Sequence, residues 1–444
     1  MPAFDPEVLA DRIRQRLEER RIAFSPEGGS YRPRQLIETV EEGGDRARPD
    51  DPIAEPQQGA EGRTYFLYEL PEDEDPVEVV NSPDNQAIRR FSLNHVLFGE
   101  PVYLGNPVYL GNPVYLGNPF DTNCALPASE PSQWGDSTGC ETRPNVLVLD
   151  TGLNTTLTEQ AREPAHPRLI GHAEIHSAWT AHDTHPHLDS SRLDEDELDT
   201  NADGSLDRQA GHGTFVSGII RKHAPDAVIH AQGVLSSFGD GDDWDISEGI
   251  NEALSRDIAI DVVNLSLGGY TDDDKAFPVL ADAIVRAQGQ GAVVVAAAGN
   301  ANSCRKFWPA CLPDVIAVGA THCGKRAWFS NFGPWVKACA PGVDIVSTFF
   351  DFDGPASNLA GIDPDQYTGW ALWSGTSFAA PQVAAAIADR MCQQGIDAIS
   401  AADAVIDDGA PVEDLGKLIQ APGAPLWKSM SADSGWDSGG LGAG

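Results

Sequence analysis

The sequence predicts an α/β fold with a doubly wound, mostly parallel sheet covered by helices on both faces, preceded by a small N-terminal α+β extension. From about residue 143, short apolar runs alternate with stretches of helical periodicity. Such alternation implies right-handed crossovers and a parallel sheet that is buried on both sides. The chain has 444 residues, of which 41% are hydrophobic, enough to fill the core of such a sheet.

The expected elements follow this alternation in order. Apolar runs typical of buried strands cover residues 146–149, 227–231, 258–265, 292–298 and 315–318. Stretches with helical periodicity cover residues 214–223, 247–256, 276–288 and 377–392. Because ligands of such sheets bind beyond the carboxyl ends of the strands, the residues that end these runs are candidates for a functional site.

The first hundred residues follow a different pattern and are predicted to form the α+β extension, residues 1–100. Asp5 is a natural N-cap and Pro6 suits a first helical turn, which predicts a helix over residues 6–22. The Glu-, Gly- and Pro-rich stretch at residues 41–62 is typical of a linker. Strand-like segments are expected at residues 65–70, 77–80 and 91–98.

A hexapeptide repeat follows the extension. Pro-Val-Tyr-Leu-Gly-Asn occurs three times without a change in residues 101–118, inside a predicted linker of residues 101–142. Each unit combines a short extended piece with a Gly-Asn-Pro turn signal, and three units are too short for a solenoid. The repeats are either a spacer or a ligand for the chain's own cleft. The large domain is expected at residues 143–429, and the Ser-, Gly- and Asp-rich residues 430–444 are predicted to be a disordered tail.

The composition limits the expected partners and the compartment. Acidic residues outnumber basic ones by 67 to 30, a net charge of −37 that repels nucleic acid and anionic membranes. No secretory signal or membrane-spanning run is visible, which predicts a cytoplasmic protein, with another export route left open. The seven cysteines are expected to be scattered thiols, although Cys124 with Cys140, or Cys304 with Cys311, could each close a loop.

Four polar residues lie where predicted elements begin or end. Asp150 and Asn300 each follow a buried strand, whereas His212 and Ser377 each stand at the start of a helix. A serine at a helix N-terminus has free backbone amides beside it that stabilise an oxyanion, and an asparagine amide donates to the same charge. Each residue alone has an ordinary structural explanation, but the set predicts nucleophilic catalysis.

The order Asp, His, Ser and the residues around each of them resemble the catalytic domain of the subtilase family, from residue 143 to about 407. The resemblance rests on Asp150-Thr151-Gly152, Gly211-His212-Gly213-Thr214, Ala297-Ala298-Gly299-Asn300 and Gly375-Thr376-Ser377-Phe378-Ala379-Ala380-Pro381. The family more often has His, Ala and Gly at three other positions, here Phe215, Ser217 and Ala385. None of these is a catalytic position, so only packing differences are expected.

The resemblance implies a serine endopeptidase that acts on a polypeptide. Ser377 would attack the scissile carbonyl, His212 would take its proton and Asp150 would hold the imidazole. Asn300 would donate to the oxyanion of the tetrahedral intermediate. No cofactor is expected for this chemistry.

The same resemblance implies how the substrate is held. The segment Ser266-Leu267-Gly268 resembles the family's substrate-binding strand, which pairs with an extended peptide and forms one wall of the primary pocket. Ala298 and Gly299 would form the other wall. The aromatic residues Phe307 and Trp308 either fill the pocket floor, which would favour small substrate residues, or pack away from the cleft.

Subtilases commonly carry an N-terminal inhibitory and folding-assisting segment, so residues 1–140 are expected to restrain the enzyme in cis. The family's usual prosegment pattern is not visible in these residues. A lipase or esterase of the α/β-hydrolase type is excluded, because it requires Gly-x-Ser-x-Gly and Ala379 replaces the second glycine. The other alternative is a catalytically degenerate subtilase that acts as a binding protein, but no catalytic residue is lost.

One acidic segment matches the first half of a calcium-binding loop. Oxygen ligands alternate along it, with glycine at the sixth position, at Asp199, Asn201, Asp203 and Asp207. The twelfth position is Ala210 rather than Glu, so the alternatives are a structural calcium site and a solvated acidic loop. Five histidines upstream are expected in a polar surface insertion rather than a zinc site, because no cysteine accompanies them: His172, His176, His182, His185 and His187.

Overall fold

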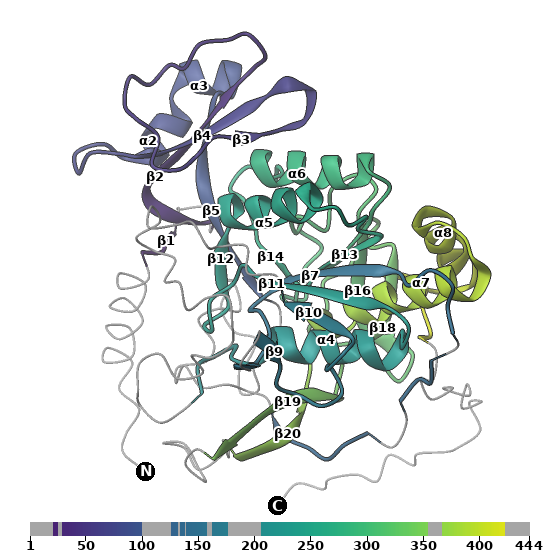
Figure 1. The fold of residues 1–444 in the computed structure, drawn as a ribbon. Coiled ribbons are helices and arrows are strands. Elements are labelled where there is room, and N and C mark those ends of the chain that lie inside the picture. Colours follow the sequence, from purple (N-terminus) through teal and green to yellow (C-terminus); the bar gives the residue numbers. More distant parts are fainter. Residues whose placement is uncertain are drawn as a thin grey trace, which may run out of the picture.

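A large, mostly parallel sheet forms the centre of the molecule. The computed structural model describes residues 21–24, 29–99, 126–131, 134–137, 139–157, 162–175, 206–353 and 366–421. Within them the sheet has ten strands in the order β10-β11-β7-β13-β15-β16-β18-β22-β21, with β17 paired to β16. All neighbours from β10 to β22 run parallel, which confirms the predicted α/β class (Figure 1).

The ten strands of this sheet include the five predicted apolar runs and five strands that were not predicted. They are β7 (Asn145–Asp150), β10 (Ala173–Ile175), β11 (Val228–Gly233), β13 (Val262–Leu265), β15 (Val293–Ala297), β16 (Ile316–His322), β17 (Lys325–Arg326), β18 (Ala338–Pro341), β21 (Ala410–Val412) and β22 (Gly416–Leu418). Because β11 and β13 lie on opposite sides of β7, the strand order reverses at β7. Ligands of open α/β sheets bind at such a switch point, at the carboxyl ends of the strands.

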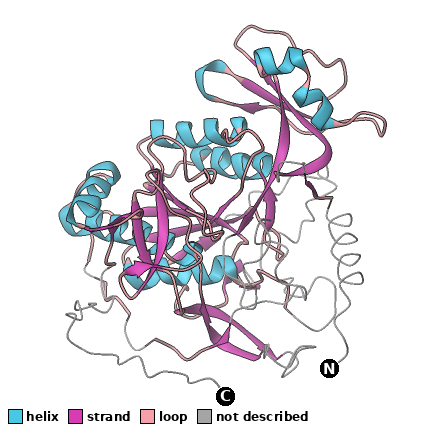
Figure 2. Cartoon of the chain, turned by 180° about the vertical axis from the view of Figure 1, so that it is seen from behind, coloured by secondary structure: helices cyan, strands magenta, loops and turns pink. Residues whose placement is uncertain are grey.

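Helices cover both faces of the sheet (Figures 1 and 2). Val146 and Val148 of β7 belong to the same hydrophobic core as α4 (His212–His223) and α7 (Ala380–Gln394). The alternate residues Leu147 and Leu149 belong to the core of the other face, with α5 (Asp243–Ser255) and α6 (Pro278–Gly289). α8 (Ala398–Asp408) packs beside α7. No helix in the described residues is long and apolar enough to cross a membrane.

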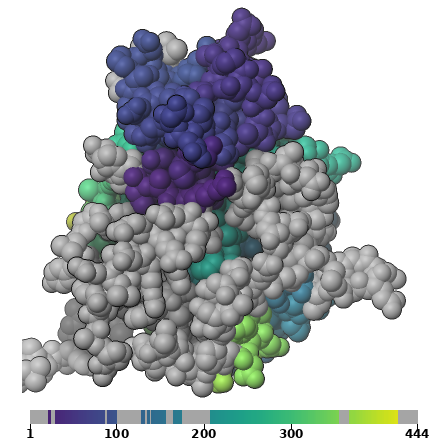
Figure 3. Space-filling model, turned by 90° about the vertical axis from the view of Figure 1, so that its left-hand side faces the viewer, coloured from purple at the N-terminus to yellow at the C-terminus, as the bar shows by residue number. Residues whose placement is uncertain are grey.

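Residues 21–99, called here the N-terminal unit, form a second, antiparallel sheet. Its strands are β1 (Ala23–Phe24), β2 (Ser30–Val40), β3 (Gln57–Gln58), β4 (Thr64–Glu69) and β5 (Phe91–Gly99). Two short strands from the large domain, β12 (Asp240–Asp242) and β14 (Leu267–Gly268), pair with β5 and extend this sheet. The N-terminal unit, purple to blue in Figure 3, therefore caps the large domain and shares a sheet with it.

One predicted element of the N-terminal unit differs from expectation. The predicted strand at residues 77–80 is wrong, because this stretch forms the helix α2 (Pro76–Asn81). The Asp75 carboxylate accepts the amide of Val77, and Pro76 occupies the first helical turn, so local capping outweighs the β-propensity of the valines. α3 (Pro83–Ile88) follows. The predicted helix at residues 6–22 falls almost wholly outside the described residues, as do the hexapeptide repeats and the predicted tail at 430–444.

The smaller elements surround the large sheet. A three-stranded antiparallel sheet is formed by β19 (Ile345–Asp353), β20 (Gln366–Trp373) and β6 (Leu126–Pro127). β8 (Thr155–Leu157) pairs with β9 (Arg162–Pro164). The short helix η4 (Thr376–Phe378) leads into α7, and η1 (Ala60–Gly62) lies before β4.

A disulfide joins Cys140, just before β7, to Cys392 near the end of α7. The expectation of scattered thiols is therefore wrong for these two residues, and Cys140 does not have the predicted partner Cys124. Cys304 and Cys311, the other expected pair, are both free thiols. Only the folded chain brings Cys140 near Cys392, since 252 positions separate them in the sequence.

We expect reduction of this disulfide to lower the stability of the protein. A cross-link between residues so far apart restricts the unfolded chain, and loss of a native disulfide typically costs about 2–5 kcal/mol. Cys392→Ser should thus lower the thermal unfolding midpoint, and a reductant should have little further effect on this variant. Cys304→Ser, which removes an exposed free thiol, is the matched control. Equal midpoints for the wild type with and without reductant would contradict the expectation.

Candidate active site

The carboxyl end of β7 brings Asp150 against His212, the first residue of α4. The imidazole Nδ1 lies 2.6 Å from Asp150 Oδ1, and the backbone amide of Thr151 donates to the same oxygen at 2.8 Å. Both side chains are buried. The approach requires Gly213, since a Cβ there would lie 2.2 Å from the carbonyl oxygen of Gly152. The carboxylate thus fixes the orientation of the imidazole, the role of an orienting acid in a catalytic triad.

Ser377 lies in η4, immediately before α7. Its hydroxyl donates to the carbonyl oxygen of Ser266 at 3.1 Å, and the Ser266 hydroxyl donates back to the Ser377 carbonyl oxygen at 2.8 Å. His212 Nε2 is buried and has no hydrogen-bond partner among the described residues. The Phe378 ring, next to Ser377 in sequence, lies 5.4 Å from the imidazole, centroid to centroid. The Ser377 O–H must therefore turn away from the Ser266 carbonyl before it can donate to His212.

Asn300 follows the carboxyl end of β15 and is tied to the same short helix. Its Oδ1 accepts the amide and the hydroxyl of Thr376, each at 3.0 Å. The Thr376 hydroxyl in turn accepts the amide of Gly299 at 3.1 Å. Because Oδ1 is engaged as an acceptor, the amide group of Asn300 is the donor that this side chain offers next to Ser377. Such a donor beside a nucleophile stabilises an oxyanion.

The two predicted walls of the primary pocket lie close together, with the ring of Phe307 between them. A Cβ on Gly268 would meet the Phe307 ring at 2.2 Å, and one on Gly299 would meet it at 3.1 Å. Phe307 is only 1% exposed and contacts Tyr270 at 5.0 Å between ring centroids. Trp308 instead forms a backbone bridge with Gly269. Phe307 rather than Trp308 therefore lies against both predicted walls.

Strand β5 of the N-terminal unit lies beside the predicted walls, where it pairs with β14. β5 lies between β12 and β14 and is antiparallel to both. Phe98 pairs with Gly268 and with Asp240, and Gly99 pairs with Leu267. Since β14 begins directly after Ser266, the direction of β5 carries the chain towards Ser377. The sequence predicted strand β5 but gave no signal for this partner, because the pairing is made by backbone groups far apart in the chain.

Two groups of charged residues attach the N-terminal unit to the large domain. The buried guanidinium of Arg32 donates to Asp242 at 3.0 Å and to Asp240 at 3.3 Å, at both ends of β12. Asp282 of α6 accepts Arg63 at 2.7 Å and the Tyr65 hydroxyl at 2.6 Å. Burial and the neighbouring Asp282 carboxylate raise the pKa of Tyr65, so it stays a hydrogen-bond donor. These contacts position β5 in the cleft.

The candidate metal ligands are not brought together in the described residues. Asp199, Asn201 and Asp203 lie outside them. Asp207 is described; its buried carboxylate accepts the hydroxyl of Ser237 at 2.6 Å. The described part of the chain contains no group of three or more His, Cys, Asp or Glu residues that could hold a metal ion. Calcium binding by the 199–207 segment stays a prediction, as does the role of the histidines upstream.

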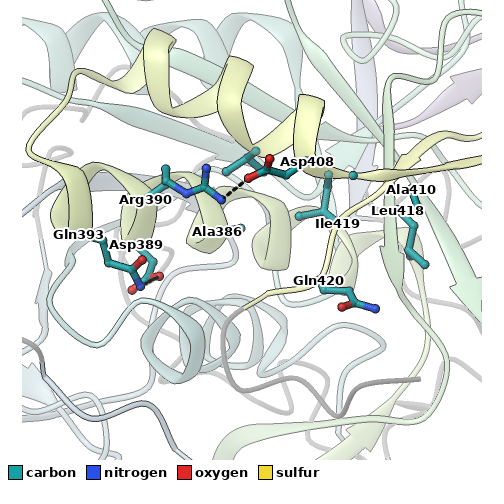
Figure 4. Close-up of a pocket in the computed structure, with 11 residues that line it drawn as sticks. Ala386, Asp389, Arg390, Gln393, Asp408, Ala410, Leu418, Ile419 and Gln420 are labelled. Atoms are coloured by element: carbon teal, nitrogen blue, oxygen red, sulfur yellow. Dashed lines mark hydrogen bonds and ion pairs between the residues drawn. The ribbon is translucent and has the colours of Figure 1, made fainter. Parts of the chain in front are cut away.

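A separate hollow lies between α7, α8 and β22 (Figure 4). Arg390 donates to Asp408 at 2.8 Å, and Gln393 donates to Asp389 at 2.6 Å. Burial and the charge of Asp226 raise the pKa of Asp389 to about 6. The lining includes no residue of the Asp150, His212 and Ser377 cluster. The Arg390–Asp408 pair joins α7 to α8, whereas Gln393 and Asp389 both belong to α7, so this feature is a joint between two helices.

Fold and site together define an α/β protein with a buried Asp-His pair and a nearby serine at the carboxyl edge of a parallel sheet. Comparison with known families assigns it further. The sequence profile described as "Subtilase family" matches residues 142–402, more than half of the chain. The chain therefore belongs to the subtilase family.

Three relatives are named proteases. The chain is 36% identical over 248 residues to "Thermophilic serine proteinase" of Bacillus sp. (strain AK1). The aligned region covers 53% of this chain and 56% of that protein. It is 34% identical over 257 residues to Subtilisin E of Bacillus subtilis (strain 168), covering 55% of this chain and 54% of that protein. It is 30% identical over 276 residues to Thermitase of Thermoactinomyces vulgaris, and the aligned region covers 60% of this chain and 80% of that protein. The match thus spans little more than half the length of the first two relatives.

We expect the junction between β5 and α5 to make stability depend on pH. Burial raises the pKa of Asp243, which accepts the His95 amide at 3.2 Å, to about 6 from an ordinary value of 3.8. The folded protein then holds this proton more tightly than the unfolded chain. Stability should fall as pH rises from about 4 to about 6, by up to about 3 kcal/mol, and stay reduced above that range. Asp243→Asn should remove this contribution.

The measurement is a series of unfolding curves between pH 4 and pH 7. The control is Asp257→Asn, which removes an exposed carboxylate close to the end of the same helix. If Asp243→Asn and the control have the same pH dependence as the wild type, the Asp243 carboxyl does not titrate in this range.

Proposed function

We propose that the chain is a serine endopeptidase that hydrolyses peptide bonds through Asp150, His212 and Ser377. The observation that carries this proposal is the buried 2.6 Å contact between His212 Nδ1 and Asp150 Oδ1, with His212 Nε2 left available. Membership of a family whose members include named serine proteinases supports it.

The proposed mechanism uses each group in turn. Ser377 turns from the Ser266 carbonyl to His212 Nε2, which takes the hydroxyl proton as the oxygen attacks the substrate carbonyl. Asp150 stabilises the resulting imidazolium, and Asn300 with the amide of Ser377 donates to the oxyanion. The imidazolium then protonates the leaving amine, and water hydrolyses the acyl-enzyme by the same route.

We also propose that the N-terminal unit restrains this activity in cis. Its strand β5 occupies the place that an extended substrate would take beside β14. The amide of Gly99 donates to the Gly239 carbonyl at 2.9 Å, which adds a contact on the β12 side of the cleft. Because the inhibitor is covalently attached, its effective concentration is in the millimolar range even if each contact is weak. Activity therefore requires β5 to leave the cleft.

The direct test of the proposed chemistry is replacement of the nucleophile. Ser377→Ala should abolish cleavage of a small peptide substrate and labelling by a fluorophosphonate, with an unchanged unfolding midpoint. Asn300→Ala should keep labelling but lose about 100- to 1,000-fold in kcat, the loss measured for the same type of donor in subtilisin. Wild-type turnover by Ser377→Ala would contradict the mechanism. A chain that starts at about residue 141, binds peptides and is never labelled would instead be a degenerate subtilase acting as a binding protein.

The position of Phe307 predicts a preference for small residues at the substrate position before the scissile bond. Phe307→Ala should open the space between Gly268 and Gly299 and raise cleavage after Phe, relative to cleavage after Ala, at least about tenfold. Trp328→Ala, at an exposed aromatic residue, is the matched control. A peptide library profiles both variants. Best cleavage by the wild type after Phe or Tyr would show that the Phe307 ring does not limit the pocket.

A further inference from the structure

The segment of β5 that lies in the cleft has the same pattern as the hexapeptide repeats that follow it. Residues 96–101 read Val-Leu-Phe-Gly-Glu-Pro, and each of residues 102–107, 108–113 and 114–119 reads Val-Tyr-Leu-Gly-Asn-Pro. Valine, glycine and proline are identical in all four units. The second and third positions are always large and apolar, and the fifth is always polar. The bound segment is therefore a divergent first copy of the repeat.

The glycine of the pattern is the residue that the cleft restricts most. The Gln209 amide donates to the Gly99 carbonyl at 3.0 Å and covers this residue. A Cβ on Gly99 would lie 1.9 Å from Gln209 Oε1 and 3.0 Å from its Cδ. Gln209 is itself fully buried and lies against Gly239, since a Cβ placed on Gly239 would be 2.0 Å from Gln209 Cδ. The Gln209 side chain therefore has little room to move. Only glycine fits this position without displacing Gln209.

The apolar positions of the pattern also match what the cleft offers. Leu97 is completely buried in the same hydrophobic core as Leu267 of β14. Val96 and Phe98 point to the other face of the strand and pack with Ile22. Backbone pairing with β12 and β14 holds all of these residues and does not depend on side-chain identity. Tyrosine in place of Leu97 and leucine in place of Phe98 keep an apolar residue at each position.

The proline of the pattern follows two positions after the glycine. A strand that continued past Gly99 in register with Leu267 would place the bond after the next residue beside Ser266, whose carbonyl accepts the Ser377 hydroxyl. In all four units this bond joins a polar residue to proline. A prolyl nitrogen carries a ring carbon instead of a hydrogen, and the ring crowds the position from which His212 must protonate the leaving nitrogen. A unit bound in this register is therefore held without being cut.

We propose that the three repeats are alternative occupants of the same cleft, each able to replace the Val96–Gly99 segment between β12 and β14 as an uncleaved pseudosubstrate. The inference rests on the proposed function and specifies its regulation. A shift to the next unit leaves the earlier one in a loop of six residues, and the entropy of loop closure grows only slowly with loop length. Displacement of the first unit thus returns the enzyme to an inhibited state, up to three times.

Peptide binding tests the recognition without requiring catalysis. The protein is the full-length chain with Ser377→Ala and with Gly→Ala at positions 99, 105, 111 and 117, which removes the glycine from every internal unit. A fluorescein-labelled peptide with the sequence of residues 101–107, Pro-Val-Tyr-Leu-Gly-Asn-Pro, should bind it saturably in fluorescence polarisation. The same peptide with alanine in place of glycine should bind at least about tenfold more weakly. No binding, or equal binding of the two peptides, would overturn the proposal.

Gln209→Ala provides a second protein in case the multiple variant does not fold. In the Ser377→Ala background this change removes the side chain that a Cβ would meet, so the preference for the glycine peptide should shrink to less than about threefold. A preference that stays tenfold in Gln209→Ala shows that another group reads the glycine and refutes the assignment to Gln209.

The activity of full-length chains that retain Ser377 tests the redundancy. Gly99→Ala alone should raise hydrolysis of a small peptide less than about threefold, because the next unit takes the vacated place. The four-fold Gly→Ala chain should be at least about tenfold more active than wild type. Equal activation by the single and the four-fold change shows that the repeats do not enter the cleft, and no activation by either shows that the glycine is not required. Both results overturn the proposal.

Two further readouts separate this proposal from the proposed function. The four-fold Gly→Ala chain that retains Ser377 is tested with a fluorophosphonate. If it binds the peptide but is not labelled, proteolysis is refuted and recognition of the repeat by the cleft is supported. A variant that is labelled should be incubated with two peptides, Pro-Val-Tyr-Leu-Gly-Asn-Pro and the same peptide with alanine in place of the last proline. Mass spectrometry should show the first peptide intact and the second cut after Asn. Cutting of the Asn-Pro bond at a comparable rate would overturn the pseudosubstrate role.

Discussion

The parallel pairing of β7, β13 and β15 is the constraint on which the site depends. Their register places the carboxyl ends of three strands side by side, so Asp150, Ser266 and the Gly299–Asn300 turn meet at one edge of the sheet. Helices α4 and α7 then enter from the same edge with His212 and Ser377 at or near their first turns. A shift of one residue in this pairing would exchange the two faces of a strand. The interleaved cores on both faces therefore also fix the geometry of the reacting groups.

The strands beside the site also belong to a second sheet, because β12 and β14 both pair with β5. β12 and β14 are too short to be stable on their own, and β5 supplies the partner between them. Buried Arg32 neutralises the two aspartates of β12, which would otherwise repel each other in a chain of net charge −37. Buried ion pairs contribute more to specificity than to net stability, because desolvation offsets much of the attraction. Arg32 thus favours one docking geometry of the N-terminal unit on β12.

Sequence reasoning recovered the parts that depend on local pattern. The buried strands that lead to Asp150 and Asn300 lie within one residue of the expected limits, and the fold class is confirmed. The failures have three causes. At residues 77–80 a capping aspartate and a proline outweighed strand propensity. β2, which crosses the whole N-terminal unit, carries Arg32, Arg34 and a proline, and polar residues of this kind mask strand alternation in a sequence. The Cys140–Cys392 disulfide could not be predicted, because spacing gives no information on contacts across 252 positions.

The repeats show most clearly what a sequence can reveal and what it cannot. Three identical units are visible at once, but the divergent first unit shares only valine, glycine and proline with them, which is too little to recognise without its surroundings. The structure singles out the glycine, through the Gln209 contact at Gly99, and it shows that β5 runs towards Ser377. Recognition by backbone hydrogen bonds explains why the intervening side chains are free to differ between units. A ligand that is read in this way can be multiplied in the chain without loss of fit, whereas one read by side-chain pockets would have to preserve every residue.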